Sequence, residues 1–197
     1  ERKKTMQETI PVEQGSMIAV LGTKNEEIID LLKLQNIDKG ICEVANDNAN
    51  GQIIISGNKN SIEALQIVLK EKKIKTISLK VSAPFHCSLM KPAAKIMEKK
   101  IYNTNFNNPV FEIINNVTAN PEVDPNKIKR LLIEQIFSTV RWRESIIKMH
   151  ENGVKNFIEI GPGKALAGMI KRTIKDVNCF SINSITDIEK FNNEFKK

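Results

Sequence analysis

The chain has 197 residues, 41% of them hydrophobic and 27% charged, so it can bury a core and is not of the disordered class. The net charge of +7 suits an acidic partner, but the lysines are scattered and only 5% of the residues are aromatic, which disfavours binding of nucleic acid. No apolar run approaches the roughly 18–20 residues of a membrane span, and three cysteines without a C-x-x-C pair, with two histidines, indicate a reducing compartment and no metal site.

The first part of the chain predicts strands and helices in the order β-α-β-β-α-β. Residues 1–8 have the pattern of a helix end closed by Pro11, and the missing start of this helix predicts a longer parent chain. Period-two alternation and helical spacing of apolar residues give the other elements. We expect strands at 16–21, 41–46, 52–56 and 74–82, helices at 23–35 and 60–71, and a turn at 46–51. This order is that of the ferredoxin-like unit, with both helices on one face of a small sheet.

The rest of the chain predicts alternating helices and strands. Such alternation is typical of a parallel sheet with helices on its faces. Two or three strands would leave open edges and an uncovered face, so we expect the larger domain to be incomplete in this chain. The helices are expected at 90–102, 124–137, 142–152 and 164–175, and the strands at 110–117, 154–160 and 179–182.

One stretch, residues 81–92, joins an expected strand to an expected helix and contains His86. Pro84 ends the strand because proline has no N–H to donate to a ladder. Two interpretations of His86 compete at this junction. An isolated histidine in a turn most often bonds a nearby backbone group, whereas an imidazole at such a junction can also act as a general base.

Other candidate residues are ordinary when taken singly. The turn Gly161-Pro162-Gly163 before a helix could hold a phosphate, but it lacks the further residues of a P-loop or dinucleotide motif, so a structural turn is favoured. Asn116 lies at a strand end and Gln135 near a helix end. Arg2 is by default a surface cation.

Taken together, however, several short strings are specific. The chain resembles the malonyl-CoA:acyl-carrier-protein transacylases of bacterial type II fatty acid synthesis, and the matching strings run in the family's order over nearly the whole length. They are residues 45–48 (ANDN), 51–58 (GQIIISGN), 84–94 (PFHCSLMKPAA), 114–117 (INNV), 135–142 (Gln135 through Val140-Arg141-Trp142) and 159–164 (EIGPGK).

The resemblance implies an α/β fold: part of an α/β-hydrolase-like acyltransferase core with an inserted ferredoxin-like (βαββαβ) subdomain. Residues 1–14 would be the end of a core helix and a linker, residues 15–82 the subdomain, and residues 83–197 the C-terminal part of the core. The implied chemistry is a ping-pong transfer, in which a serine on a G-x-S-x-G turn takes malonyl from coenzyme A and passes it to the phosphopantetheine thiol of acyl carrier protein.

The resemblance also implies roles for four residues. His86 corresponds to the catalytic base, and Arg2 to the arginine that binds the malonyl carboxylate, for which a bidentate guanidinium is suited. Gln135 corresponds to a glutamine that lines the substrate site. Asn116 corresponds to the residue whose backbone carbonyl orients the histidine, a neutral substitute for the acid of a triad.

The chain departs from the family in one large respect, because no G-x-S-x-G occurs in its 197 residues. We therefore expect it to be inactive alone. The expected substrates and partners are malonyl-CoA and the acidic acyl carrier protein, with no bound cofactor or metal, no nucleic acid and no membrane, in a cytoplasmic protein that is monomeric when intact. One alternative is a non-catalytic remnant that binds a carrier protein, and another is a basic ferredoxin-like domain that binds nucleic acid.

Overall fold

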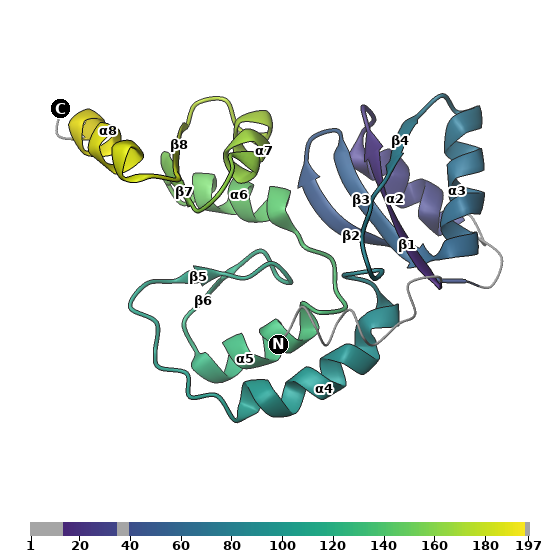
Figure 1. Cartoon of the computed structure of the whole chain (residues 1–197), viewed down its shortest axis with the longest axis horizontal. Coiled ribbons are helices and arrows are strands. Elements are labelled where there is room, and N and C mark those ends of the chain that lie inside the picture. Colours follow the sequence, from purple (N-terminus) through teal and green to yellow (C-terminus); the bar gives the residue numbers. More distant parts are fainter. Residues whose placement is uncertain (1–13, 35–39, 196–197) are drawn as a thin grey trace. The chain divides into compact units, whose positions relative to one another are not determined.

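The computed structural model describes residues 14–34 and 40–195, in two compact units, Glu1–Ser145 and Ile146–Lys197 (Figure 1). The expected helix end at 1–8 and the predicted site residue Arg2 lie outside the described residues. The expected boundary between the ferredoxin-like subdomain and the acyltransferase core, at residues 82 and 83, falls inside the first unit and stays a prediction. Within the described residues, no helix is long and apolar enough to cross a membrane.

The first unit contains a four-stranded sheet with the strand order β2-β3-β1-β4, in which all neighbouring strands are antiparallel. Two helices connect the strands, so the predicted order β-α-β-β-α-β is observed. The elements are β1 (Gly15–Leu21), α2 (Asn25–Leu34), β2 (Cys42–Ala49), β3 (Gln52–Asn58), α3 (Lys59–Glu71) and β4 (Lys75–Ser78).

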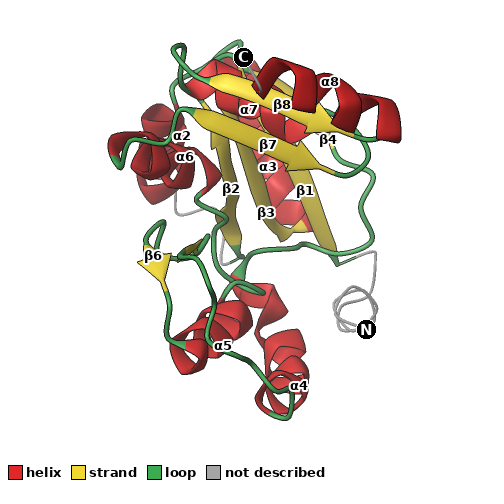
Figure 2. Cartoon of the chain, turned by 90° about the vertical axis from the view of Figure 1, so that its left-hand side faces the viewer, coloured by secondary structure: helices red, strands yellow, loops and turns green. Residues whose placement is uncertain are grey.

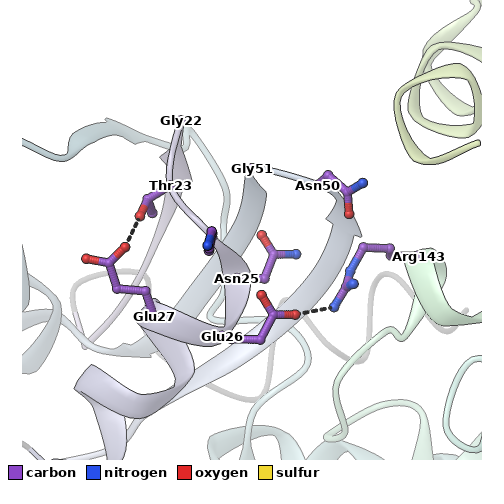
Figure 3. Close-up of a pocket in the computed structure, with 9 residues that line it drawn as sticks. Gly22, Thr23, Asn25, Glu26, Glu27, Asn50, Gly51 and Arg143 are labelled. Atoms are coloured by element: carbon purple, nitrogen blue, oxygen red, sulfur yellow. Dashed lines mark hydrogen bonds and ion pairs between the residues drawn. The ribbon is translucent and has the colours of Figure 1, made fainter.

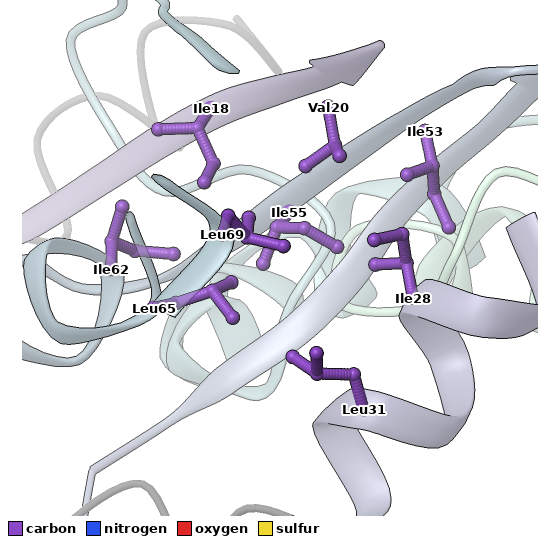
Figure 4. Packing of buried hydrophobic residues seen from close by; sticks show 9 residues of the cluster. All are labelled: Ile18, Val20, Ile28, Leu31, Ile53, Ile55, Ile62, Leu65 and Leu69. Atoms are coloured by element: carbon purple, nitrogen blue, oxygen red, sulfur yellow. The ribbon is translucent and has the colours of Figure 1, made fainter. Parts of the chain in front are cut away.

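The two central strands, β1 and β3, are buried on both faces of the sheet. Successive side chains of a strand point to opposite faces, and in these two strands successive residues are buried. Ile18 and Val20 of β1 point to one face, where they pack with residues of α2 and α3, so both helices cover this face (Figure 4). Met17 and Ala19 point to the other face, against which Phe85 packs. The loop that contains His86 therefore lies against the side of the sheet that the helices leave uncovered.

Two strand predictions need correction. The expected turn at 46–51 is wrong, since β2 continues to Ala49 and only Asn50 and Gly51 form the turn. Register shifts interrupt the pairing of β2 with β3 between Val44 and Asn46 and between Asp47 and Ala49. The expected strand at 74–82 shortens to β4, Lys75–Ser78.

The remainder of the first unit is mainly helical. After a short 3-10 turn, Ser88–Met90, come α4 (Lys91–Tyr102), β5 (Ile113–Ile114), β6 (Pro121–Glu122) and α5 (Pro125–Glu134). The expected strand at 110–117 is thus reduced to two residues, which pair with β6. Asp124 caps α5 through a hydrogen bond from the backbone N–H of Asn126, as the predicted helix start requires.

The second unit begins within α6 (Trp142–Glu151), because the division of the chain falls between Ser145 and Ile146. It contains two strands that pair in parallel, β7 (Asn156–Ile160) and β8 (Asn178–Ile182). Helix α7 (Ala165–Thr173) connects them in sequence (Figure 2). Helix α8 (Ile185–Phe195) was not predicted, although Ser184 and Asp187 form the capping interaction that marks a helix start.

Candidate active site

His86 lies in the loop between β4 and α4, half-buried, with a positive φ of 59°. Few residues other than glycine adopt this backbone conformation, and it persists where surrounding structure enforces it. The ring atom Nδ1 lies 2.9 Å from the backbone carbonyl oxygen of Gln135. Because a carbonyl only accepts, Nδ1 carries the hydrogen and donates it, and in the neutral ring Nε2 is the basic nitrogen.

Packing between two helices brings His86 and Gln135 together, although 49 positions separate them in sequence. Met90 and the small residues Ala93 and Ala94 of α4 share a buried cluster with Ile136, the residue after Gln135. Gln135 is the C-cap of α5, so its carbonyl is among those that have no partner inside the helix. The C-terminal end of a helix dipole also favours positive charge nearby.

The carbonyl that was expected to orient the histidine, that of Asn116, is not the one bonded to Nδ1 of His86. The carbonyl of Asn116 accepts a hydrogen bond of 3.0 Å from the backbone N–H of Arg141, whereas the carbonyl that holds Nδ1 of His86 is that of Gln135. The neighbouring Asn115 closes its own turn, since its side-chain oxygen accepts from the N–H of Val117. Gln135, predicted to line the substrate site, therefore contacts His86 through its backbone.

The loop before His86 is fixed by close packing. Pro84 is fully buried against Gly15, where a Cβ atom would lie 2.4 Å from the proline ring, so only glycine fits at the start of β1. Cys87 is also buried; its thiol donates to the carbonyl of Pro84, and burial raises its pKa. Cys87 is therefore a protonated packing residue, unsuited to act as a nucleophile.

The residues after His86 are held by Glu43 of β2, a contact that the sequence analysis missed. Both carboxylate oxygens of Glu43 accept hydrogen bonds from Ser88, one from its backbone and one from its hydroxyl. These residues are 45 positions apart, and no pattern in the sequence links them.

The turn Gly161-Pro162-Gly163 is a structural turn, as favoured above. The carboxylate of Glu159 accepts hydrogen bonds from the backbone N–H groups of Leu166 and Ala167, in the first turn of α7. An acidic side chain thus occupies the helix end at which a phosphate would bind.

A hollow of about 680 Å³ lies at the start of α2, lined by none of the predicted site residues (Figure 3). Among its charged groups, Arg143 pairs with Glu26, and Glu27 accepts a hydrogen bond from the neutral hydroxyl of Thr23. The charges are thus largely balanced inside the hollow. Among the described residues, no group of three or more histidine, cysteine or acidic side chains could hold a metal ion.

Comparisons with known proteins agree with this architecture, although no protein-family model matches the chain. A malonyl CoA-acyl carrier protein transacylase of Haemophilus influenzae is 38% identical over 192 residues, which are 97% of this chain and 60% of the relative. The acyl-carrier-protein S-malonyltransferase of Bartonella henselae is 36% identical with a TM-score of 0.93, covering 100% of this chain and 62% of that one. A malonyl-transacylase in complex with a type II PKS acyl-carrier protein is 33% identical with a TM-score of 0.91, covering 98% of this chain and 62% of that one.

The fold of the chain is thus similar to that of solved α/β acyltransferases. Within that class, the chain is a relative of the malonyl CoA-acyl carrier protein transacylases, and it spans about three-fifths of their length. The resemblance noted in the sequence is confirmed.

Proposed function

We propose that this chain supplies the histidine base of a malonyl-CoA:acyl-carrier-protein transacylase. The observation that carries the proposal is the 2.9 Å hydrogen bond from Nδ1 of His86 to the Gln135 carbonyl. This bond selects the tautomer in which Nε2 can accept a proton, the state that a general base needs. The arrangement is a dyad in which a helix-end carbonyl replaces the carboxylate of a triad.

In the proposed mechanism, Nε2 of His86 takes the proton of a serine hydroxyl as that oxygen attacks the malonyl thioester of coenzyme A. The imidazolium then returns the proton to the leaving thiolate, and coenzyme A departs. In the second half, His86 takes the proton of the phosphopantetheine thiol of acyl carrier protein as the sulfur attacks the acyl-serine. The imidazolium then returns the proton to the departing serine oxygen. Whenever His86 carries a proton on both nitrogens, its positive charge lies near the negative C-terminal end of α5.

The serine itself is not among the 197 residues, since no G-x-S-x-G occurs in them. We infer that the chain is inactive alone, and that residues 15–82 form a ferredoxin-like subdomain inserted into an α/β-hydrolase-like core. The sheet order β2-β3-β1-β4 with two helices on one face supports the subdomain.

The proposed partner, acyl carrier protein, is acidic, and the net charge of +7 on this chain would attract it.

The test is a chimera in which the part of the Haemophilus influenzae relative that precedes its match is joined ahead of this chain. We expect malonyl transfer between coenzyme A and acyl carrier protein by the chimera, and none above background by the chain alone. Transfer is measured by mass spectrometry of the carrier protein. A folded chimera that binds carrier protein without transferring malonyl would favour the non-catalytic remnant, and His86-dependent transfer by the chain alone would contradict the inferred need for an added serine.

A second prediction concerns Arg2, the proposed partner of the malonyl carboxylate. In the chimera, Arg2→Ala is expected to slow malonyl transfer. The activation free energy should rise by about 2–5 kcal/mol, the usual effect of removing one member of a desolvated charge pair. Acetyl transfer should fall much less, because acetyl has no carboxylate. Both rates are measured with the two coenzyme A thioesters, and Lys3→Ala is the control. Equal losses for the two acyl groups would make Arg2 a structural residue.

A further inference from the structure

Glu43 binds the loop of His86 with both of its carboxylate oxygens. The backbone N–H of Ser88 donates to Oε2 at 2.8 Å, and the Ser88 hydroxyl donates to Oε1 at 2.5 Å. Hydrogen bonds to an ionised acceptor are stronger than neutral ones, and this pair is half-buried. The edge strand β2 thus holds the chain two residues after His86.

This contact acts on a strained segment. His86 has a φ of 59°, a conformation that is unfavourable for most residues with a side chain and that contacts of the surrounding residues help to maintain. Before His86, the fixed neighbour is Pro84, packed against Gly15. After it, the loop is bonded to the sheet at two places: Cys87 accepts a hydrogen bond from the hydroxyl of Ser56 on β3, and Ser88 donates two to Glu43 on β2.

The same strand also holds the other member of the His86–Gln135 pair. Just beyond Gln135, the hydroxyl of Thr139 donates to the carbonyl of Val44 at 2.6 Å. The N–H of Val140 donates to Ala45, and its carbonyl accepts from Asp47, at 2.8 and 2.9 Å. Four residues of β2, Glu43, Val44, Ala45 and Asp47, therefore bond the segments that carry the imidazole and its carbonyl acceptor.

We propose that Glu43 is a positioning residue for His86. Through Ser88, it keeps Nδ1 of the imidazole on the Gln135 carbonyl and so keeps the basic lone pair on Nε2. The role rests on the proposed function of His86 as a base. The two hydrogen bonds described for Glu43 go to Ser88, so the proposed influence on His86 passes through the backbone.

The first experiment measures the tautomer of His86 in the chain itself, by ¹⁵N NMR of histidine-labelled protein. The chain has two histidines, and His150 of α6 is the internal reference. We expect His86 to be the Nδ1–H tautomer in the unmodified chain and a mixture of both tautomers in Glu43→Ala. The signals of His150 should not change.

Graded variants separate positioning from general loss of structure. Glu43→Gln still offers one oxygen to the Ser88 N–H and should keep most of the Nδ1–H form. Ser88→Ala removes one of the two hydrogen bonds and should give an intermediate result. Glu27→Ala is the control, because the Glu27 carboxylate lies on α2 and accepts from Thr23, so its removal should leave His86 unchanged. A native amide spectrum with an unchanged His86 tautomer in Glu43→Ala overturns the proposal, and if that variant does not fold, an unchanged tautomer in Ser88→Ala does so.

The second experiment uses the chimera described above. Glu43→Ala is expected to lower kcat for malonyl transfer by about 10- to 100-fold, the effect of a small misplacement of a catalytic group. KM for malonyl-CoA should change less than twofold, because Glu43 is not proposed to contact substrate. A rise in KM at unchanged kcat would contradict the positioning role. Failure of the proposed function can be distinguished from failure of the positioning role, because the tautomer measured by NMR does not depend on malonyl transfer.

Discussion

His86→Ala is expected to slow formation of the acyl-serine in the chimera by about 10²- to 10⁴-fold, the usual contribution of a general base. The physical reason is that the serine hydroxyl would have no group nearby to accept its proton as it attacks. Acylation is followed by release of coenzyme A in a single turnover. Binding of the proposed carrier protein should barely change, because we expect it to depend on cationic groups elsewhere on the surface.

The matched control is the second histidine of the chain. His150 lies on α6 in the second unit, where its ring contacts Lys155 and Asp176. His150→Ala is expected to leave acylation within about twofold of the unmodified chimera, since a surface substitution of this kind seldom alters more than local contacts. Equal rates for the His86→Ala and unmodified chimeras would exclude His86 as the base.

The hydrogen-bond partner of His86 could not be predicted from residue types. Every residue at a helix C-terminus offers a carbonyl, so the identity of Gln135 as acceptor follows from the packing of α4 against α5 and not from its side chain. Asn116 was a reasonable expectation, but its carbonyl is used by Arg141. The position of His86 itself, by contrast, followed from a strand signal and a proline.

Long-range contacts also explain the misread turn at 46–51. Asparagine and aspartate are common turn residues because their side chains can bond the local backbone. Here the side chain of Asp47 instead bonds Asn25 and Arg143, and its backbone bonds Val140. These partners hold β2 extended to Ala49, so tertiary contacts override the local preference.

The largest effect on stability is expected from Asp47→Ala, because Asp47 is a buried acceptor of several hydrogen bonds. Its side chain is 6% exposed and pairs with Arg143, which is 18% exposed. One of its oxygens accepts from Asn25 at 2.5 Å and from Nε of Arg143 at 2.9 Å. The hydrogen bond with Asp47 raises the pKa of Arg143, so the guanidinium stays charged.

Removing the carboxylate would leave this half-buried cation with only the exposed Glu26 among its described ion-pair partners. Deleting one member of a buried pair costs about 3–5 kcal/mol, since the remaining charge keeps its desolvation cost. The loss is measured by urea unfolding followed through the fluorescence of Trp142, the single tryptophan, which directly precedes Arg143. Asp30→Ala is the control, because Asp30 pairs with Lys33 on the exposed face of α2 and should cost at most about 1 kcal/mol.

A double variant tests whether the uncompensated charge is the cause. Replacing Arg143 with methionine as well removes the cation and keeps much of its apolar volume, so Asp47→Ala/Arg143→Met should recover part of the lost stability. If the double variant is instead less stable than Asp47→Ala by the full effect of Arg143→Met alone, the two residues act independently. The loss would then be assigned to the hydrogen bond with Asn25, the remaining described side-chain partner of Asp47.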